Sequence, residues 1–184
     1  SYVGEQGWEL YFPFSDGLAI WDALFELGVT PVGIETYANS RRLEKSLRLQ
    51  NADLETEYNL YEAGLARPKV KAADFHGKEA YVQQRELDEQ AAYLCTFVLQ
   101  DTTDSNSIVR YPVGNWPILD AESKEVIIDS HGRRSYTTSM AFGPSLGVNV
   151  AMGYLPAHKA TEGDSVLIEY FGEHYEAKVM KIGY

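Results

Sequence analysis

The stretch YTTSMAFGPSLGVNVAMGYLP, residues 136–156, decides the fold class of the second half of this chain. It covers two β-rich runs, at 135–139 and 148–154, which flank a segment of Gly, Pro and Ser that favours a turn. Further short β-rich runs lie at 92–99, 116–119, 125–128, 165–170 and 175–180. Short strands separated by turn residues, with no convincing helix among them, predict a small β-sandwich or β-barrel.

The first 90 residues have a different pattern, in which strands alternate with helices. The aromatic run 8–12 ends at Pro13 and predicts a strand. A helix is expected to follow, with Asp16 as its N-cap and Gly28 at its end. The next elements expected are a helix at 37–47, a short strand at 66–71 and a helix at 77–86. The fold class is therefore predicted to be α+β, with a domain boundary near residue 90.

Composition narrows the classes of partner. The formal net charge of −11 disfavours nucleic acid, because phosphate contacts require a local excess of Lys and Arg. No apolar stretch reaches the roughly 18–20 residues of a membrane span, so no membrane partner is expected. One local group of cations suits a small anionic ligand instead: Arg41, Arg42, Lys45 and Arg48.

Cysteine and histidine usage gives no sign of a metal site. The single cysteine, Cys95, lies within the run 93–99, where a buried structural thiol is the ordinary outcome. The four histidines are scattered along the sequence, at positions 76, 131, 158 and 174. No metal is therefore expected.

Five sequence blocks occur in an order that is typical of one family. They are SYVGEQGWELYFP (1–13), NSRRLEKSLRLQNADL (39–54), YEAGL (61–65), DFHGKEAYVQQRE (74–86) and the stretch 136–156. Together they resemble the glycine-cleavage T-proteins and, more closely, the folate-binding C-terminal regions of sarcosine and dimethylglycine dehydrogenases. Arg41 and Ser46 depart from the family pattern, which has Leu and Gly there, and Leu60 replaces a usual proline.

The resemblance implies both architecture and activity. Residues 1–90 would be the C-terminal part of a folate-binding α+β domain, and residues 91–184 a small jelly-roll-like β-barrel. The implied function is part of a tetrahydrofolate-dependent aminomethyltransferase or methyltransferase. The rest of the module, with a conserved aspartate that assists transfer, is expected to precede Ser1. No flavin-binding motif is present in these residues, so any oxidation is expected in another domain.

Three residues are carried over as candidate folate contacts. Glu9 matches a carboxylate that binds the pterin edge, whose two adjacent N–H groups suit bidentate acceptance. Tyr2 matches an aromatic residue that lines the folate pocket, and Arg42 an arginine near the folate and its glutamate tail. Each also has a plain structural interpretation: a solvent-facing strand residue, a core or edge tyrosine, and a solvated helix face. Trp8 is expected in the core, and Ser139 is expected to be structural.

Other possibilities remain open at this stage. The alternative to the transferase is a non-catalytic binding or scaffold module that keeps the fold without the catalytic aspartate. A face normally covered by the absent half would be apolar, so the chain is expected to form a homodimer through it. The resemblance implies a cytoplasmic location, or the mitochondrial matrix in a eukaryote, and leaves the one-carbon donor undetermined.

Overall fold

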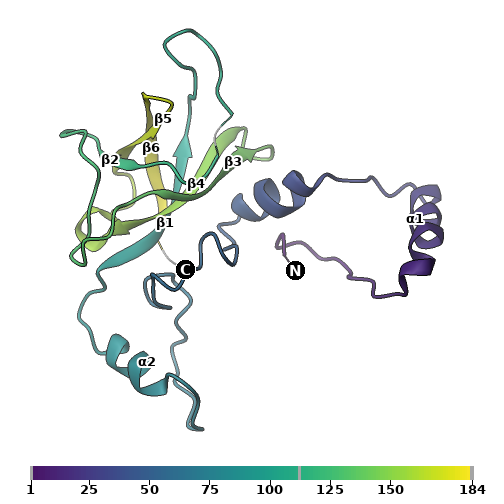
Figure 1. Ribbon diagram of the computed structural model, residues 1–184, viewed down its shortest axis with the longest axis horizontal. Coiled ribbons are helices and arrows are strands. Elements are labelled where there is room, and N and C mark those ends of the chain that lie inside the picture. The colour runs from purple at the N-terminus through teal and green to yellow at the C-terminus, as the bar shows by residue number, and fades with distance from the viewer. Residues whose placement is uncertain (1, 112, 183–184) are drawn as a thin grey trace.

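The computed structural model describes residues 2–111 and 113–182 (Figure 1). Its main feature is one six-stranded antiparallel sheet in the order β2-β5-β6-β1-β4-β3. The strands are β1 (Ala92–Leu99), β2 (Ile118–Asp120), β3 (Thr137–Gly143), β4 (Val148–Pro156), β5 (Ser165–Tyr170) and β6 (Glu173–Ile182). The sheet curls into a half-barrel, which confirms the α+β fold class with a β-barrel in the second half.

The helices lie outside this sheet. They are α1 (Gly17–Glu26), the π-helical segment η2 (Thr36–Arg41) and α2 (Lys78–Arg85), with short 3-10 turns η1 (Phe14–Asp16) and η3 (Ala157–Lys159). In Figure 1, α1 lies at the far end of an arm that extends away from the sheet, and α2 lies on the other side of the molecule. Among the described residues, no helix is long and apolar enough to cross a membrane.

In the barrel, β5 and β6 alternate buried and more exposed residues. On β6, Tyr175, Ala177 and Val179 are buried, whereas the intervening side chains face solvent. Because successive strand residues point to opposite faces, this pattern gives one apolar and one polar face. The buried face packs on Phe97, Ile118 and other members of one cluster. Cys95 belongs to it with a fully buried thiol, and burial raises the pKa of that thiol to about 12.

The other faces of β1 and β4 bury a second cluster. Leu94, Val150 and Met152 pack there with Leu43 and Ala63, which come from the first half of the chain. The central strands are therefore buried on both sides. This second cluster attaches the segment around residues 43–63 to the barrel.

Gly153 marks the tightest backbone approach in the sheet. A Cβ atom there would lie 2.5 Å from the carbonyl oxygen of Tyr136 and 2.8 Å from Cδ1 of Ile118. Close by, the amide of Ile118 donates to the carbonyl of Ser135 at 3.0 Å, so the chain at the start of β2 meets the chain that leads into β3. Glycine at position 153 lets the sheet curl this tightly.

The first half departs from expectation in several places. Residues 8–12 are extended but pair with no strand among the described residues, and 66–71 forms a loop, so both strand predictions are wrong. A strand needs a ladder partner, which local sequence does not provide. The helix after Asp16 is confirmed, and Gly28 follows it with φ of +82°. No residue of α1 is buried, and Trp8 is 91% exposed rather than in the core.

Candidate functional site

The candidate site is a hollow beside the start of the chain, with a volume of about 380 Å³. Tyr2 and Glu9, two of the three predicted contacts, both line it. The ring of Tyr2 stacks on Tyr37, with centroids 4.8 Å apart and planes 16° from parallel. The structure therefore places an aromatic wall and a carboxylate around one space. The remaining lining residues are Val3, Glu5, Gln6, Gly7 and Trp8.

The segment that forms this hollow is held to the helix by ion pairs. Glu5 accepts from Lys45 at 2.5 Å and from Arg41 at 3.3 Å. Lys45 also donates to the carbonyl of Gly4 at 3.0 Å, and Gly4 has φ of +67°, a conformation that favours glycine. The hydrogen bond from Lys45 holds the pKa of Glu5 below its usual value. Glu5 is an anchor that sequence reasoning did not single out.

Glu9 is exposed and only partly engaged. Its Oε2 accepts a hydrogen bond of 2.8 Å from the hydroxyl of Tyr11, which raises the pKa of Tyr11. Within the described part of the chain, Oε1 has no hydrogen-bond donor. A carboxylate in this state has acceptor capacity left for a ligand's N–H groups.

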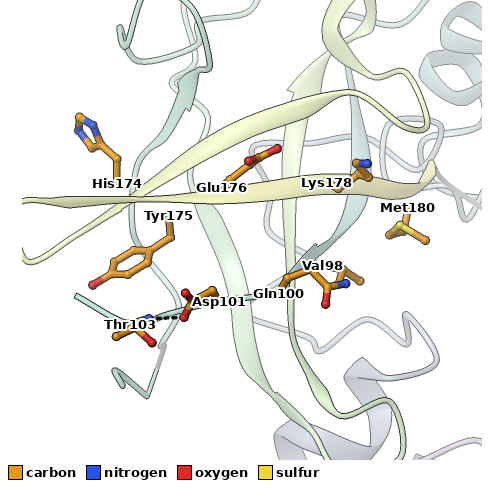
Figure 2. Close-up of a pocket in the computed structure, with 9 residues that line it drawn as sticks. All are labelled: Val98, Gln100, Asp101, Thr103, His174, Tyr175, Glu176, Lys178 and Met180. Atoms are coloured by element: carbon orange, nitrogen blue, oxygen red, sulfur yellow. Dashed lines mark hydrogen bonds between the residues drawn. The ribbon is translucent and has the colours of Figure 1, made fainter. Parts of the chain in front are cut away.

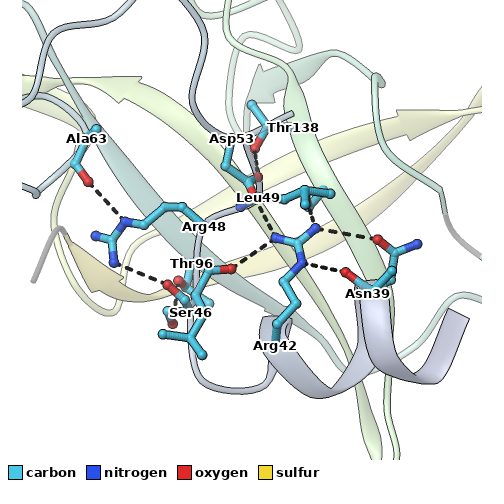
Figure 3. A network of polar contacts seen from close by, with 12 residues as sticks. Asn39, Arg42, Ser46, Arg48, Leu49, Asp53, Ala63, Thr96 and Thr138 are labelled. Atoms are coloured by element: carbon cyan, nitrogen blue, oxygen red, sulfur yellow. Dashed lines mark hydrogen bonds and ion pairs between the residues drawn. The ribbon is translucent and has the colours of Figure 1, made fainter. Parts of the chain in front are cut away.

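Arg42 has a different placement from the other two predicted contacts (Figure 3). Its side chain is 1% exposed and does not line the hollow. The guanidinium pairs with Asp53 and donates to the hydroxyl of Ser139 at 2.6 Å, which brings β3 into the same network. Its other bonds go to the carbonyls of Ala38 at 3.0 Å and Leu47 at 3.1 Å, and to Asn39 at 3.5 Å.

These bonds use every N–H that a guanidinium carries. Arg42 is therefore an interior residue in this structure, and it does not converge with Glu9 on a shared space. The choice between the adjacent arginines is also resolved, since Arg41 is the one that faces outward. Folate contact by Tyr2, Glu9 or Arg42 stays a prediction.

The basic group predicted to bind a small anion is not a single patch. Arg41 and Lys45 hold Glu5, and Arg42 is buried against Asp53. Arg48 donates to the carbonyls of Ala63 at 3.0 Å and Ser46 at 3.2 Å. Arg41 and Arg42 are helical, whereas Lys45 lies in the turn that follows and Arg48 in the next loop, so the four cations serve separate internal acceptors.

A second buried network, which sequence analysis missed, joins the two halves of the chain. Arg133 pairs with Glu62 at 2.5 Å and with Asp129 at 2.6 Å, and its guanidinium lies 4.2 Å from the centre of the Tyr58 ring. Tyr58 stacks in turn on Tyr154 of β4. Glu62 lies in the YEAGL block and also accepts from the amide of Asn59, so it stabilises the turn there. Arg133 carries no comparable sequence signal.

Another hollow lies on the outer side of β6, with a volume of about 420 Å³ (Figure 2). Asp101 and Glu176 line it together with Lys178 and His174. The lining therefore mixes acidic and basic side chains and has no cluster of one charge. In the part of the chain that the structure describes, no three His, Cys, Asp or Glu side chains are placed to hold a metal ion.

Residues 1–71 match the GCVT N-terminal domain family, and residues 114–182 match the glycine cleavage T-protein C-terminal barrel domain. The chain is thus a member of the glycine-cleavage T-protein family.

Individual relatives support the same assignment. The chain is 32% identical over 187 residues to human mitochondrial dimethylglycine dehydrogenase, covering 98% of this chain and 20% of that protein. It is also 32% identical over 182 residues to an aminomethyltransferase of Prochlorococcus marinus strain MIT 9303, covering 98% of this chain and 44% of the relative. The chain therefore spans a fifth to under half of these relatives.

A solved structure shows the same fold. The crystal structure of the glycine cleavage system aminomethyltransferase T from Bartonella henselae superposes with a TM-score of 0.72 at 24% identity. The superposition covers 92% of this chain and 44% of that one. At this level of identity the likeness concerns the fold alone.

Proposed function

We propose that this chain provides one wall of a tetrahydrofolate site in an enzyme that transfers a one-carbon unit. The observation that carries the proposal is the shared hollow of Tyr2 and Glu9. A flat pterin ring suits stacking against the Tyr2 and Tyr37 pair, and its adjacent N–H groups suit the free acceptor sites of Glu9. The hollow has the size of an ordinary ligand pocket.

In such a reaction the protein acts mainly by positioning the folate and excluding water from the reactive carbon. The hollow is formed largely by the single segment 2–9, which leaves much of it open to solvent. We propose that further residues, supplied in the longer relatives by the rest of the module, close the site and carry the aspartate that assists transfer. No described residue is assigned a catalytic role.

The proposal includes a division of labour along the chain. Residues 1–90 would contribute to folate binding, and residues 91–184 would form the barrel that supports them. The two family matches fall on either side of this boundary, and β1 begins at Ala92. A cytoplasmic or mitochondrial matrix location is proposed on the same basis, since one group of relatives is named mitochondrial. The one-carbon donor is not specified by these residues.

A non-catalytic binding or scaffold role is the second candidate. The observation that favours it is the complete internal pairing of Arg42, which leaves no guanidinium donor for a folate carboxylate. On that alternative the Arg42 and Asp53 pair is purely structural.

Calorimetric titration of tetrahydrofolate into the chain tests the proposal. Glu9→Gln keeps the size of the side chain but removes its charge, and we expect about tenfold weaker binding, because charge-assisted hydrogen bonds are roughly twice as strong as neutral ones. Glu89→Gln is the matched control at another exposed glutamate, and its affinity should equal that of the parent chain. Binding that is equal in all three proteins would remove Glu9 from the site, and no binding by the parent chain would favour the scaffold role.

A further inference from the structure

A second hollow with a distinct chemistry borders α2. It has a volume of about 330 Å³, and one side is lined by the cations Arg67, Lys69 and Lys71. The other lining residues include Leu65 and the aromatic residues Phe75 and Tyr81. None of these residues lines the proposed folate hollow.

The three cations are not engaged by acidic groups. Within residues 2–111 and 113–182, none of them forms an ion pair, whereas six other cations do: Arg41, Arg42, Lys45, Arg110, Arg133 and Lys159. All three are exposed, on a chain whose formal net charge is −11. This local concentration of positive charge therefore runs against the charge of the whole molecule, and it leaves donors free for an anion.

The loop that carries these cations is fixed by side chains of α2. The hydroxyl of Tyr81 accepts from the amide of Arg67 at 2.9 Å. Arg85 donates to the carbonyl of Pro68 at 2.6 Å, and Lys78 donates to the carbonyl of Ala72 at 2.9 Å. Side chains of α2 are therefore hydrogen-bonded to the backbone of the loop. These bonds order the hollow before any ligand binds. Such preorganisation lowers the entropic cost of binding.

From these contacts we infer that the hollow beside α2 is a binding site for a small aromatic anion, with the ring against Phe75 and the acid group among the three cations. An ammonium or guanidinium group attracts phosphate or carboxylate oxygens, and an aromatic wall contributes by burying the flat part of the ligand. Neither part of the site would be sufficient alone. The site is separate from the folate hollow and serves a second ligand.

Three small molecules distinguish the contribution of the ligand's negative charge from that of its aromatic ring. Isothermal titration of the full chain with 1-naphthyl phosphate should give measurable binding, whereas inorganic phosphate, which lacks the ring, and 1-naphthol, which lacks the charge, should each bind at least about tenfold more weakly. If inorganic phosphate binds as well as 1-naphthyl phosphate, the cations alone account for binding, and the inference is overturned.

Variants then locate the binding. The double substitution of Lys69→Gln and Lys71→Gln should weaken the binding of 1-naphthyl phosphate about tenfold, as expected for two exposed ionic contacts. Phe75→Leu should weaken the same binding severalfold. Lys124→Gln, on a turn of the barrel, is the matched control and should change nothing. Glu9→Gln should also leave this affinity unchanged, so the result stands apart from the folate proposal. Unchanged binding in the lysine and phenylalanine variants would overturn the assignment.

Discussion

Arg42 and Tyr2 meet at a single atom. The carbonyl oxygen of Ala38 accepts from Nε of Arg42 at 3.0 Å and from the hydroxyl of Tyr2 at 3.2 Å. A guanidinium that is 1% exposed is thereby one residue away from the ring that lines the proposed folate hollow. This shared acceptor links the interior network around Asp53 and Ser139 to the surface of the site.

The first prediction concerns the buried pair of Arg42 and Asp53. Arg42→Lys keeps the charge but loses the planar fork, so several acceptors lose their donor. We expect the free energy of unfolding to fall by about 2 kcal/mol or more, measured by urea denaturation. Arg41→Lys, at the neighbouring exposed position, should cost less than about 0.5 kcal/mol. A loss in Arg42→Lys no larger than in Arg41→Lys would contradict the role given to the buried network.

The second prediction tests the tight approach at Gly153. An added methyl group would overlap the carbonyl of Tyr136, and the backbone of the curled sheet would have to move. Gly153→Ala should therefore lower the free energy of unfolding by about 1–3 kcal/mol. Gly33→Ala is the control, because open space surrounds that position. Equal stability of the two variants would show that the sheet tolerates the methyl group.

The third prediction uses the ion pairs of Glu5. Lys45 lowers the pKa of Glu5 in the folded chain, so the folded state favours the ionised form. The attachment of Glu5 to Lys45 is then complete at pH values above 4.5, the pKa of Glu5 in the unfolded chain. It is lost as the pH falls through the lower pKa of Glu5 in the folded chain. The protection factors of the amides at 3–8, which are exchange rates corrected for the intrinsic effect of pH, should fall over that acidic range.

Glu5→Gln is the companion variant for this experiment. It removes the titrating group, so the same amides should already exchange fast near neutral pH and show no further step on acidification. Protection in that variant equal to the parent chain would mean that Lys45 and Arg41 do not hold the segment.

The fourth prediction concerns the apolar arm. Trp21 is 56% exposed and Phe25 60% exposed on α1, and both line a shallow apolar hollow. We expect such a surface to drive self-association, which sedimentation velocity detects as an increase in sedimentation coefficient with concentration. Trp21→Glu with Phe25→Glu should abolish that increase. A parent chain that stays monomeric at high concentration would contradict the proposed homodimer.

The barrel was largely predictable because its strands are short β-rich runs separated by turn residues. The runs 92–99 and 165–170 match β1 and β5 to the residue, and the run 175–180 lies within β6. β-rich composition and turn residues are local signals, so the sequence displays them directly. The helix after Asp16 was equally visible, because its apolar spacing and terminal glycine are local signals too.

The site was predictable only in part, since burial depends on residues distant in sequence. Arg42 has the same local pattern as an exposed helical cation, yet Ser139, 97 positions later, accepts its hydrogen bond. Residues 8–12 have a strand-like composition but no partner among the described residues. Glu9 and Tyr2 were placed together by family resemblance rather than by any periodicity.

The most direct test is a crystal structure of the chain with tetrahydrofolate bound. The account predicts the pterin ring against Tyr2 and Tyr37, with its N–H groups within hydrogen-bond distance of Glu9 and with Arg42 still paired to Asp53. A pterin bound elsewhere, for example in the cation-lined hollow beside α2, would contradict it.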